Sequence, residues 1–370
     1  MLRLPMAVFA SAALFCQAAG AQLPARHTAA SGATLTGSAA NPQSERAGSA
    51  QSELQTGSAL TGEGFLTQAI PHLLAARSQG VAPYATGVNL AICYLGTNQY
   101  KEAVSALREL VAQGRATAIV YNLLAQAYLG SHQRQQAWQS FSLAAAATPR
   151  DERLYDYLAD ACTDQGDDSL GLEIVNRGLK ELPESARLHY ERAVFLARLG
   201  NLEQARPEFE RAAGLAPDSD TGYLAEVQQA LYDDQYPKAE AVLHQANQAG
   251  HSDFRMLSLL GTVLLHEGAS PGDPKFAEAK TALEKSAQEH PNYSATQIAL
   301  GKVYLMEGRP RLAVEHLEAG RRLEPENPAV YASLAAAWEK LGDREKAATM
   351  RRQIGRLIAQ KAANGRLVKP

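Results

Sequence analysis

Nine histidines and three cysteines are the residues around which acid–base, nucleophilic or metal chemistry could be built. The sequence contains no H-E-x-x-H, G-x-S-x-G, C-x-x-C or phosphate-loop glycine pattern, and no histidine is followed by another four residues later. The histidines are therefore expected to be polar residues at the surface or between structural repeats. The pattern predicts no catalytic residue, no bound metal and no cofactor.

Acidic residues are concentrated between Asp151 and Glu184, where ten carboxylates face three basic side chains. Asp156, Asp160 and Asp164 are four residues apart, so they lie along one face of a helix. Three interpretations stay open for this stretch. It is a negative patch for a basic partner, a weak calcium site, or a solvated helix face, and the solvated face is the simplest of the three.

The first 21 residues have the pattern of a secretory signal peptide. Arg3 supplies a positive start, an apolar run covers residues 6–15, and Ala19-Gly20-Ala21 precedes the expected cleavage before Gln22. The alternative is an uncleaved anchor, but the run is shorter than the roughly 20 residues that a spanning helix needs. We expect export to the periplasm or the medium, with no transmembrane segment. Residues 22–49 are rich in Ala, Ser, Gly and Thr, which predicts a flexible linker.

The opposite end of the chain is basic. Residues 340–370 carry nine Lys and Arg against two acidic residues, whereas the whole chain has a net charge of −3. Attraction to a membrane surface or to nucleic acid is one interpretation. No aromatic residue interleaves these charges, and export argues against nucleic acid, so a solvated cap is the preferred interpretation.

A period of 34 residues organises the rest of the chain. Pro149, Pro183 and Pro217 are 34 apart, and so are Pro291 and Pro325. Small residues recur with the same period, with one interval of 40, at Ala69, Ala103, Ala137, Gly171, Ala205, Ala239, Ala279, Ala313 and Ala347. A second series of mostly small residues runs Ala91, Ala125, Ala159, Ala193, Val227, Gly261, Gly301 and Ala335 with the same single long interval. Repeats of this length indicate a stack of helix pairs.

The spacing resembles the tetratricopeptide repeat, whose pattern is W-x2-L-G-x2-Y, then A-x3-F, then P. The best copy is Tyr121, Leu124, Ala125, Tyr128, Ala137, Phe141 and Pro149. The resemblance implies an all-α solenoid of about eight helix-turn-helix repeats over residues 50–354, forming a right-handed superhelix. The first repeat is degenerate, six extra residues fall at 269–274, and residues 355–370 form the end of a capping helix and a tail.

Packing within each repeat follows from these positions. Ala91, Ala125 and Gly301 of first helices are expected to approach small residues of second helices, which lets the helix axes come close. Gly166, Gly200, Gly268, Gly308 and Gly342 are expected to end first helices with left-handed backbone. Asp167 and Asp168 are expected to cap the helix that follows. Cys93 and Cys162 lie two repeats apart on core faces, which predicts buried free thiols and no disulfide.

Because first helices line the concave surface in similar repeats, we expect the partner-binding residues there. Amides can pair with a peptide backbone, and tyrosines offer amphipathic contact area. The candidates for this groove are Asn89, Asn122, Gln126, Asp156, Tyr157, Asp160, Tyr190, Glu191, Gln228 and Lys302. The chaperone-docking members of the family use a Lys/Asn clamp for a carboxylate, and this sequence lacks that set at matching places.

The resulting hypothesis is an exported, non-enzymatic scaffold that binds a protein or peptide segment in the groove, and a basic segment is one candidate. An alternative is an accessory subunit of an envelope-assembly, polysaccharide-export or secretion machine. An enzyme is a third class, but no residues remain outside the repeats to build a separate catalytic domain. The sequence does not identify the partner or the oligomeric state.

Overall fold

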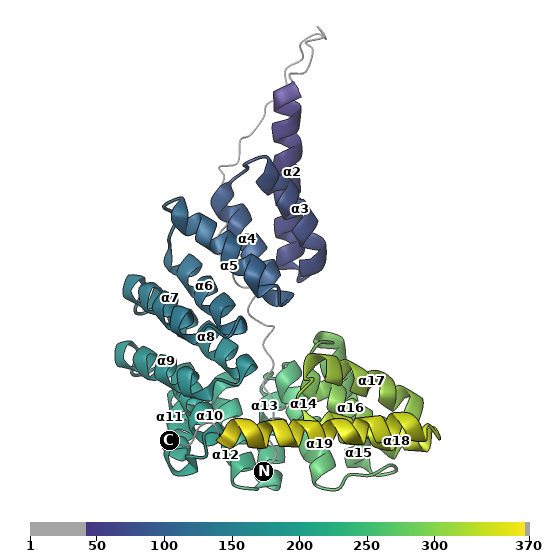
Figure 1. Ribbon diagram of the computed structural model, residues 1–370. Helices are drawn as coiled ribbons and strands as arrows, with labels where there is room; N and C mark the ends of the chain where they lie inside the picture. The colour runs from purple at the N-terminus through teal and green to yellow at the C-terminus, as the bar shows by residue number, and fades with distance from the viewer. Residues whose placement is uncertain (1–41, 367–370) are drawn as a thin grey trace, which may run out of the picture. The chain divides into compact units, whose positions relative to one another are not determined.

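The computed structural model describes residues 42–366, and side chains over 48–360 (Figure 1). The expected signal peptide 1–21, the first part of the linker and the last four residues lie outside the described residues. Helix α2 begins at Pro42, inside the segment 22–49 that was expected to be a linker. Its Ala50 and Leu54 are buried, because this first helix already packs against the next one.

Every element of the described chain is an α-helix, eighteen in number, and neighbours in the sequence pair up (Figure 1). This confirms the expected all-α fold of stacked helix pairs, with nine pairs where about eight were expected. The chain divides into two compact units, which we call the N-terminal unit (described over 42–183) and the C-terminal unit (184–366).

The N-terminal unit contains four pairs. Their helices are α2 (Pro42–Gly62), α3 (Leu66–Ser78), α4 (Pro83–Gly96), α5 (Tyr100–Ala112), α6 (Ala118–Gly130), α7 (Arg134–Ala147), α8 (Glu152–Gln165) and α9 (Asp168–Glu181).

The C-terminal unit contains five pairs. Their helices are α10 (Ala186–Arg198), α11 (Leu202–Leu215), α12 (Asp220–Tyr232), α13 (Tyr236–Gln248), α14 (Phe254–His266), α15 (Pro274–Glu289), α16 (Ser294–Met306), α17 (Pro310–Leu323), α18 (Pro328–Lys340) and α19 (Arg344–Arg366).

Small residues bring the two helices of a pair into close contact. Ala91 and Ala103 are fully buried between α4 and α5, as predicted. At Gly301 of α16, a Cβ atom would lie only 2.4 Å from Cγ of Leu317 on α17. Leu317 is itself fully buried, so it has little room to move away. The pairs therefore close on positions where side-chain volume is minimal.

The first helix of each pair forms an inner row. In the N-terminal unit α2, α4, α6 and α8 contact one another in turn, and in the C-terminal unit α14, α16 and α18 do the same. Second helices lie across the junctions, since α3 contacts α4, α5 contacts α6, and α17 contacts α18. Each pair thus covers the apolar side of its neighbour, and the clusters of buried residues run from one pair to the next.

The turn between the helices of a pair uses left-handed backbone in every repeat, and the longer turn between α14 and α15 uses it twice, at Gly268 and Gly272. All five predicted glycines have positive φ, for example 70° at Gly166 and 72° at Gly308. Asn98, His132 and Asp234 hold the same position in other repeats with φ of 59°, 58° and 56°. The series therefore continues in repeats without a glycine, where the fold imposes a conformation that L-residues resist.

Caps and buried thiols also agree with the sequence. The side chain of Asp167 accepts a hydrogen bond from the backbone N–H of Leu170 at 3.2 Å, which caps α9. Cys93 and Cys162 are both buried and free. The six-residue insertion lies between α14 and α15, and Asp273 caps α15 by accepting from the N–H of Lys275 at 2.9 Å. Nζ of Lys275, the residue after the insertion, lies 2.8 Å from Glu240 and 3.0 Å from Glu267. Lys275 therefore forms ion pairs with two carboxylates.

The close approach at Gly301 can be tested by adding one methyl group. Gly301→Ala should lower the free energy of unfolding by about 1–3 kcal/mol, because the new Cβ overlaps Leu317. Gly355→Ala in α19 is the matched control, since a Cβ there meets nothing within 4 Å. The control should raise stability by about 0.5–1 kcal/mol through helix propensity. Urea denaturation followed by circular dichroism measures both, and equal shifts would contradict the packing argument.

The left-handed turn can be tested by exchanging residues between neighbouring repeats. His132→Gly should stabilise the N-terminal unit by about 1 kcal/mol, because glycine adopts positive φ without a Cβ clash. Gly166→His, the reverse change 34 residues further on, should destabilise it by a similar amount although the space around Gly166 is empty. Thermal denaturation of the two variants should move in opposite directions, and a shift in the same direction would refute the explanation.

Candidate functional site

The two middle helices of the inner row in the N-terminal unit carry no charge. Helices α4 and α6 contain no Asp, Glu, Lys or Arg, and neither has a residue that is exposed to solvent. A helix that is apolar on all sides is stable only when other elements surround it. Polar groups on this row are therefore few, and each requires a partner.

The amide side chains of the inner row find their partners within the protein. Nδ2 of Asn122 donates to the carbonyl oxygen of Leu154 on α8 at 3.2 Å, which links two repeats. Nε2 of Gln126 donates to Oδ1 of Asn122 at 2.9 Å. Asn89 donates to Ser58 at 3.2 Å and to the carbonyl oxygen of Ala85 at 3.0 Å. Asn89 and Asn122 are buried, whereas Gln126 is half-buried and keeps part of its amide accessible.

Asp156 and Asp160 occupy the positions on α8 that Asn122 and Gln126 occupy on α6, one repeat later. Both carboxylates are half-buried, and α6 and α8 are in contact. We call these four residues, Asn122, Gln126, Asp156 and Asp160, the inner polar patch. The patch places two carboxylates and an accessible amide beside α6, a helix without charged residues.

Tyr157 lies next to this patch but is buried. Loss of water around its hydroxyl is the main cause that raises the pKa of Tyr157, while the nearby Arg153 acts in the opposite direction. The phenol therefore stays neutral and contributes packing. Contact between this side chain and a partner remains a prediction.

Tyr190 and Glu191 on α10 are almost inaccessible, at 1% exposure each. Burial raises the pKa of Tyr190, and its ring packs edge-to-face against Phe209 with centroids 6.1 Å apart. The carboxylate of Glu191 forms an ion pair with Arg187 at 2.8 Å. These side chains offer little surface to another molecule, because they are buried by the packing of the helices.

Gln228 and Lys302 hold, in the C-terminal unit, the repeat position of Gln126 and Asp160. Gln228 on α12 is buried. Lys302 on α16 is exposed, yet the protein around its ammonium displaces water and lowers the pKa of Lys302. The same position thus carries a carboxylate in the N-terminal unit and a cation in the C-terminal unit.

Nucleophilic chemistry finds little support in the described residues. Burial raises the pKa of Cys162, so its thiolate is strongly disfavoured. Sγ of Cys93 lies 3.2 Å from the hydroxyl oxygen of Thr61. Both thiols behave as small core residues.

Three histidines bridge the same two repeat positions, a link that the sequence had not suggested. His72 and His316 lie on second helices, whereas His189 lies on a first helix and its partner Glu208 holds the second-helix position. Nδ1 of His72 lies 2.6 Å from Glu53, Nδ1 of His189 lies 2.6 Å from Glu208, and Nδ1 of His316 lies 2.7 Å from Oε1 of Gln297. Each pair joins the two helices of one repeat across 19 residues of sequence. That separation, recurring in register, is the signal that could have identified them.

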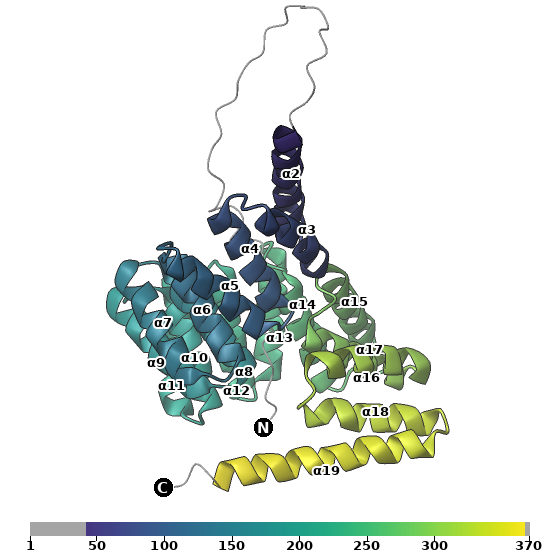
Figure 2. The same cartoon turned by 45° about the horizontal axis from the view of Figure 1, so that its top comes forward.

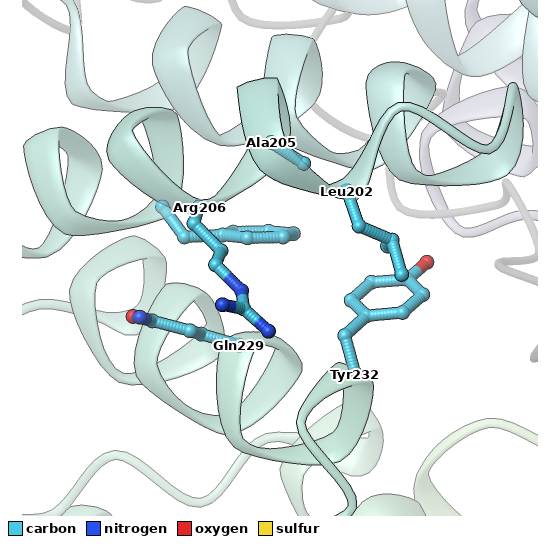
Figure 3. A pocket seen from close by; sticks show the side chains of 6 residues that line it. Leu202, Ala205, Arg206, Gln229 and Tyr232 are labelled. Atoms are coloured by element: carbon cyan, nitrogen blue, oxygen red, sulfur yellow. The ribbon is translucent and has the colours of Figure 1, made fainter.

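A small slot opens where α11 meets α12 (Figure 3). Leu202, Arg206 and Phe209 line it from α11, and Gln229 and Tyr232 line it from α12. Its volume is about 10 Å³, enough for about one water molecule. Phe209 and Tyr232 stack with centroids 5.9 Å apart. The slot is a joint between repeats and is too small for a ligand.

The same joint is built differently elsewhere. At α13 and α14, Tyr236 and His266 stack with centroids 4.0 Å apart. At α5 and α6, the ring of Tyr100 lies so close to Gly130 that a Cβ there would be 2.2 Å from it. The same two repeat positions therefore meet in each joint, although their side chains differ from one joint to the next. The slot is part of the repeat architecture.

No helix in the described part of the chain is long and apolar enough to cross a membrane.

Comparison with known proteins agrees with this architecture. Family models described as tetratricopeptide repeat match residues 87–113, 158–220 and 272–337. A search of curated proteins finds no match.

Three solved structures share the fold. A tetratricopeptide repeat protein from Parabacteroides merdae has a TM-score of 0.50 at 16% identity, covering 69% of this chain and 98% of that chain. The Cut9–Hcn1 hetero-tetramer of the APC/C gives 0.51 at 12% identity, with 85% and 76% covered. Yeast Tom70 gives 0.50 at 16% identity, with 74% and 59% covered. With the 34-residue register, the paired helices and three family matches in agreement, these segments of the chain are tetratricopeptide repeats, and the fold is that of a tetratricopeptide repeat protein.

Proposed function

We propose that this chain is an exported, non-enzymatic scaffold that holds a basic segment of another protein at the inner polar patch. Tetratricopeptide repeat proteins are in general protein-binding scaffolds, which supports the first part of the proposal. The Cut9–Hcn1 structure, similar in fold, is itself an assembly of two proteins. The proposal for this chain rests on its own residues.

The single observation that carries the proposal is the position of the inner polar patch. Asp156 and Asp160 stay half-buried on a row whose neighbouring helices α4 and α6 have no charge at all. Both carboxylates keep part of their surface accessible, and they lie in register on one helix face. A partner's Lys or Arg can pair with them, and the amide of Gln126 can pair with the partner's backbone.

Charge gives this interaction its specificity. The stretch from Asp151 to Glu184 has ten acidic and three basic residues, so it attracts cationic segments over a Debye length of about 8 Å at physiological salt. Binding should therefore weaken as salt is raised. An acidic or neutral segment gains nothing from the patch.

Export is proposed from residues 1–21, which have the signal-peptide pattern and lie outside the described residues. An extracytoplasmic scaffold would present its repeats to proteins of the envelope or the medium. The buried free thiols of Cys93 and Cys162 are compatible with such a compartment, because oxidants reach buried sulfur slowly.

The inner polar patch is tested by reversing its charge. Asp156→Lys together with Asp160→Lys should weaken binding of a pulled-down partner by about tenfold or more at low salt, because two attractions become repulsions. The control is Glu102→Lys with Glu203→Lys, which makes the same change in net charge at exposed positions of second helices outside the acidic stretch. Titration by surface plasmon resonance distinguishes them. Unchanged affinity in the patch variant would remove the proposal.

Export is tested by the mass of the mature chain. Secretion with cleavage after Ala21 should give a product that begins at Gln22. Replacing both Ala19 and Ala21 by Phe should leave the leader attached, since the cleavage site requires small side chains. Intact-mass spectrometry of the extracytoplasmic fraction measures whether residues 1–21 are present in the wild type and in the variant. Full-length wild-type protein confined to the cytoplasm would show that the leader is not functional.

A further inference from the structure

In the C-terminal unit, every second helix before the last is covered by the first helix of the next pair. Helix α11 contacts α12, α13 contacts α14, α15 contacts α16, and α17 contacts α18. Figure 3 shows one such joint, in which Leu202, Arg206 and Phe209 of α11 face α12. This face of a second helix is the standard docking surface for another helix in this fold.

Helix α19 is the last second helix of the described chain and packs against α18 (Figure 2). In the 34-residue register, Arg344, Ala348 and Arg351 take the places of Leu202, Arg206 and Phe209. The same face continues along α19 to Gly355 and Ile358. We call these five residues the outer stripe of α19.

The outer stripe is open. Arg344, Arg351, Gly355 and Ile358 are exposed, and Ile358, at 57%, is an exposed large apolar side chain. A Cβ added at Gly355 would meet nothing within 4 Å. Ala348 and Gly355 are the smallest residues of the stripe, and we call the open space over them the channel. The neighbouring face is occupied, because Met350, Ile354 and Leu357 pack in the core cluster of the unit.

The charge of α19 restricts what can fill this channel. The helix has seven basic residues and one acidic residue. Arg351 forms an ion pair with Glu339 of α18. Among the described side chains, Arg344, Arg352 and Arg356 form no ion pair with a carboxylate. Arg352 donates a hydrogen bond to the hydroxyl of Thr349 at 2.8 Å. A covering element must therefore bring carboxylates with it.

We propose that the outer stripe of α19 binds an acidic amphipathic helix of a partner protein, which takes the place of the next first helix. Its apolar side packs over Gly355 and against Ile358, and its carboxylates pair with Arg344, Arg352 and Arg356. The contact continues the geometry by which each pair in this unit covers the previous one. This surface is separate from the inner polar patch, and the inference does not depend on the function proposed there.

Two other occupants fit the stripe less well. A membrane surface would need a broader apolar face, and Ile358 is the one large apolar side chain on the stripe. The first helix of a second copy, α2, has two acidic residues and one basic residue, and its Glu53 lies 2.6 Å from His72. It offers little charge to complement α19. An acidic helix satisfies both the channel and the arginines.

The test uses the full mature chain and a fluorescein-labelled helical peptide of about five turns, built of Ala, Leu and Glu with one apolar face. The same peptide with Lys in place of Glu is the charge control. Gly355→Leu fills the channel and should lower affinity for the Glu peptide about tenfold, without loss of thermal stability, because the added side chain enters empty space. Arg352→Glu with Arg356→Glu should weaken binding similarly and flatten its salt dependence.

The matched control is Gly214→Leu in α11, which is another exposed helical glycine with empty space around it. It should bind like the wild type. Equal binding of the Glu and Lys peptides, or equal affinity of wild type and Gly355→Leu, would overturn the proposal. The proposal would also be overturned if the wild type failed to bind the Glu peptide and the stripe instead served another occupant. A membrane would be that occupant if the stripe variants abolished binding to anionic phosphatidylglycerol vesicles. A second copy would be that occupant if they abolished self-association in the ultracentrifuge.

Discussion

Close contact between two helices at one small residue per helix is the constraint on which the structure depends. At Gly301 even a methyl group would overlap Leu317, and at Gly261 a Cβ would lie 2.9 Å from the carbonyl oxygen of Ala279. These contacts set how near the two axes approach, and therefore how much apolar surface each pair leaves for its neighbour. Because no single pair can bury its own apolar side, the pairs are stable only when stacked.

The joints between pairs show how the sequence varies while this geometry stays fixed. One position at the start of a second helix and one at the end of the next first helix meet. A large Tyr100 meets Gly130, whereas Leu202 meets Tyr232 and Tyr236 stacks on His266. The residue types at these two positions therefore vary from joint to joint, while the pairing of the helices stays the same.

Function follows from which surfaces this stacking consumes. Packing has taken Tyr190, Glu191 and Asn89 into the protein, so their polar groups serve the fold. What remains accessible is the inner polar patch on α6 and α8 and the outer stripe on α19. One is acidic and lies on the inner row, while the other is basic and lies at the last pair. Both surfaces consist of side chains that are not fully buried, so helix packing does not dictate which residue types occur there.

The sequence by itself determined the class of fold and the register of the repeats, because small residues, prolines and left-handed glycines recur at the period of a helix pair. It also determined that Cys93 and Cys162 are core residues. It did not place the start of the first helix, which begins at Pro42. Tertiary structure alone decided which inner-row side chains are accessible. Periodicity assigns a residue to a helix face, but the exposure of that face depends on volumes contributed by residues 30 or more positions away. Tyr190 and Asp156 share a repeat position, yet one is buried and the other half-buried, and the outer stripe becomes visible only once α18 has packed against the neighbouring face of α19.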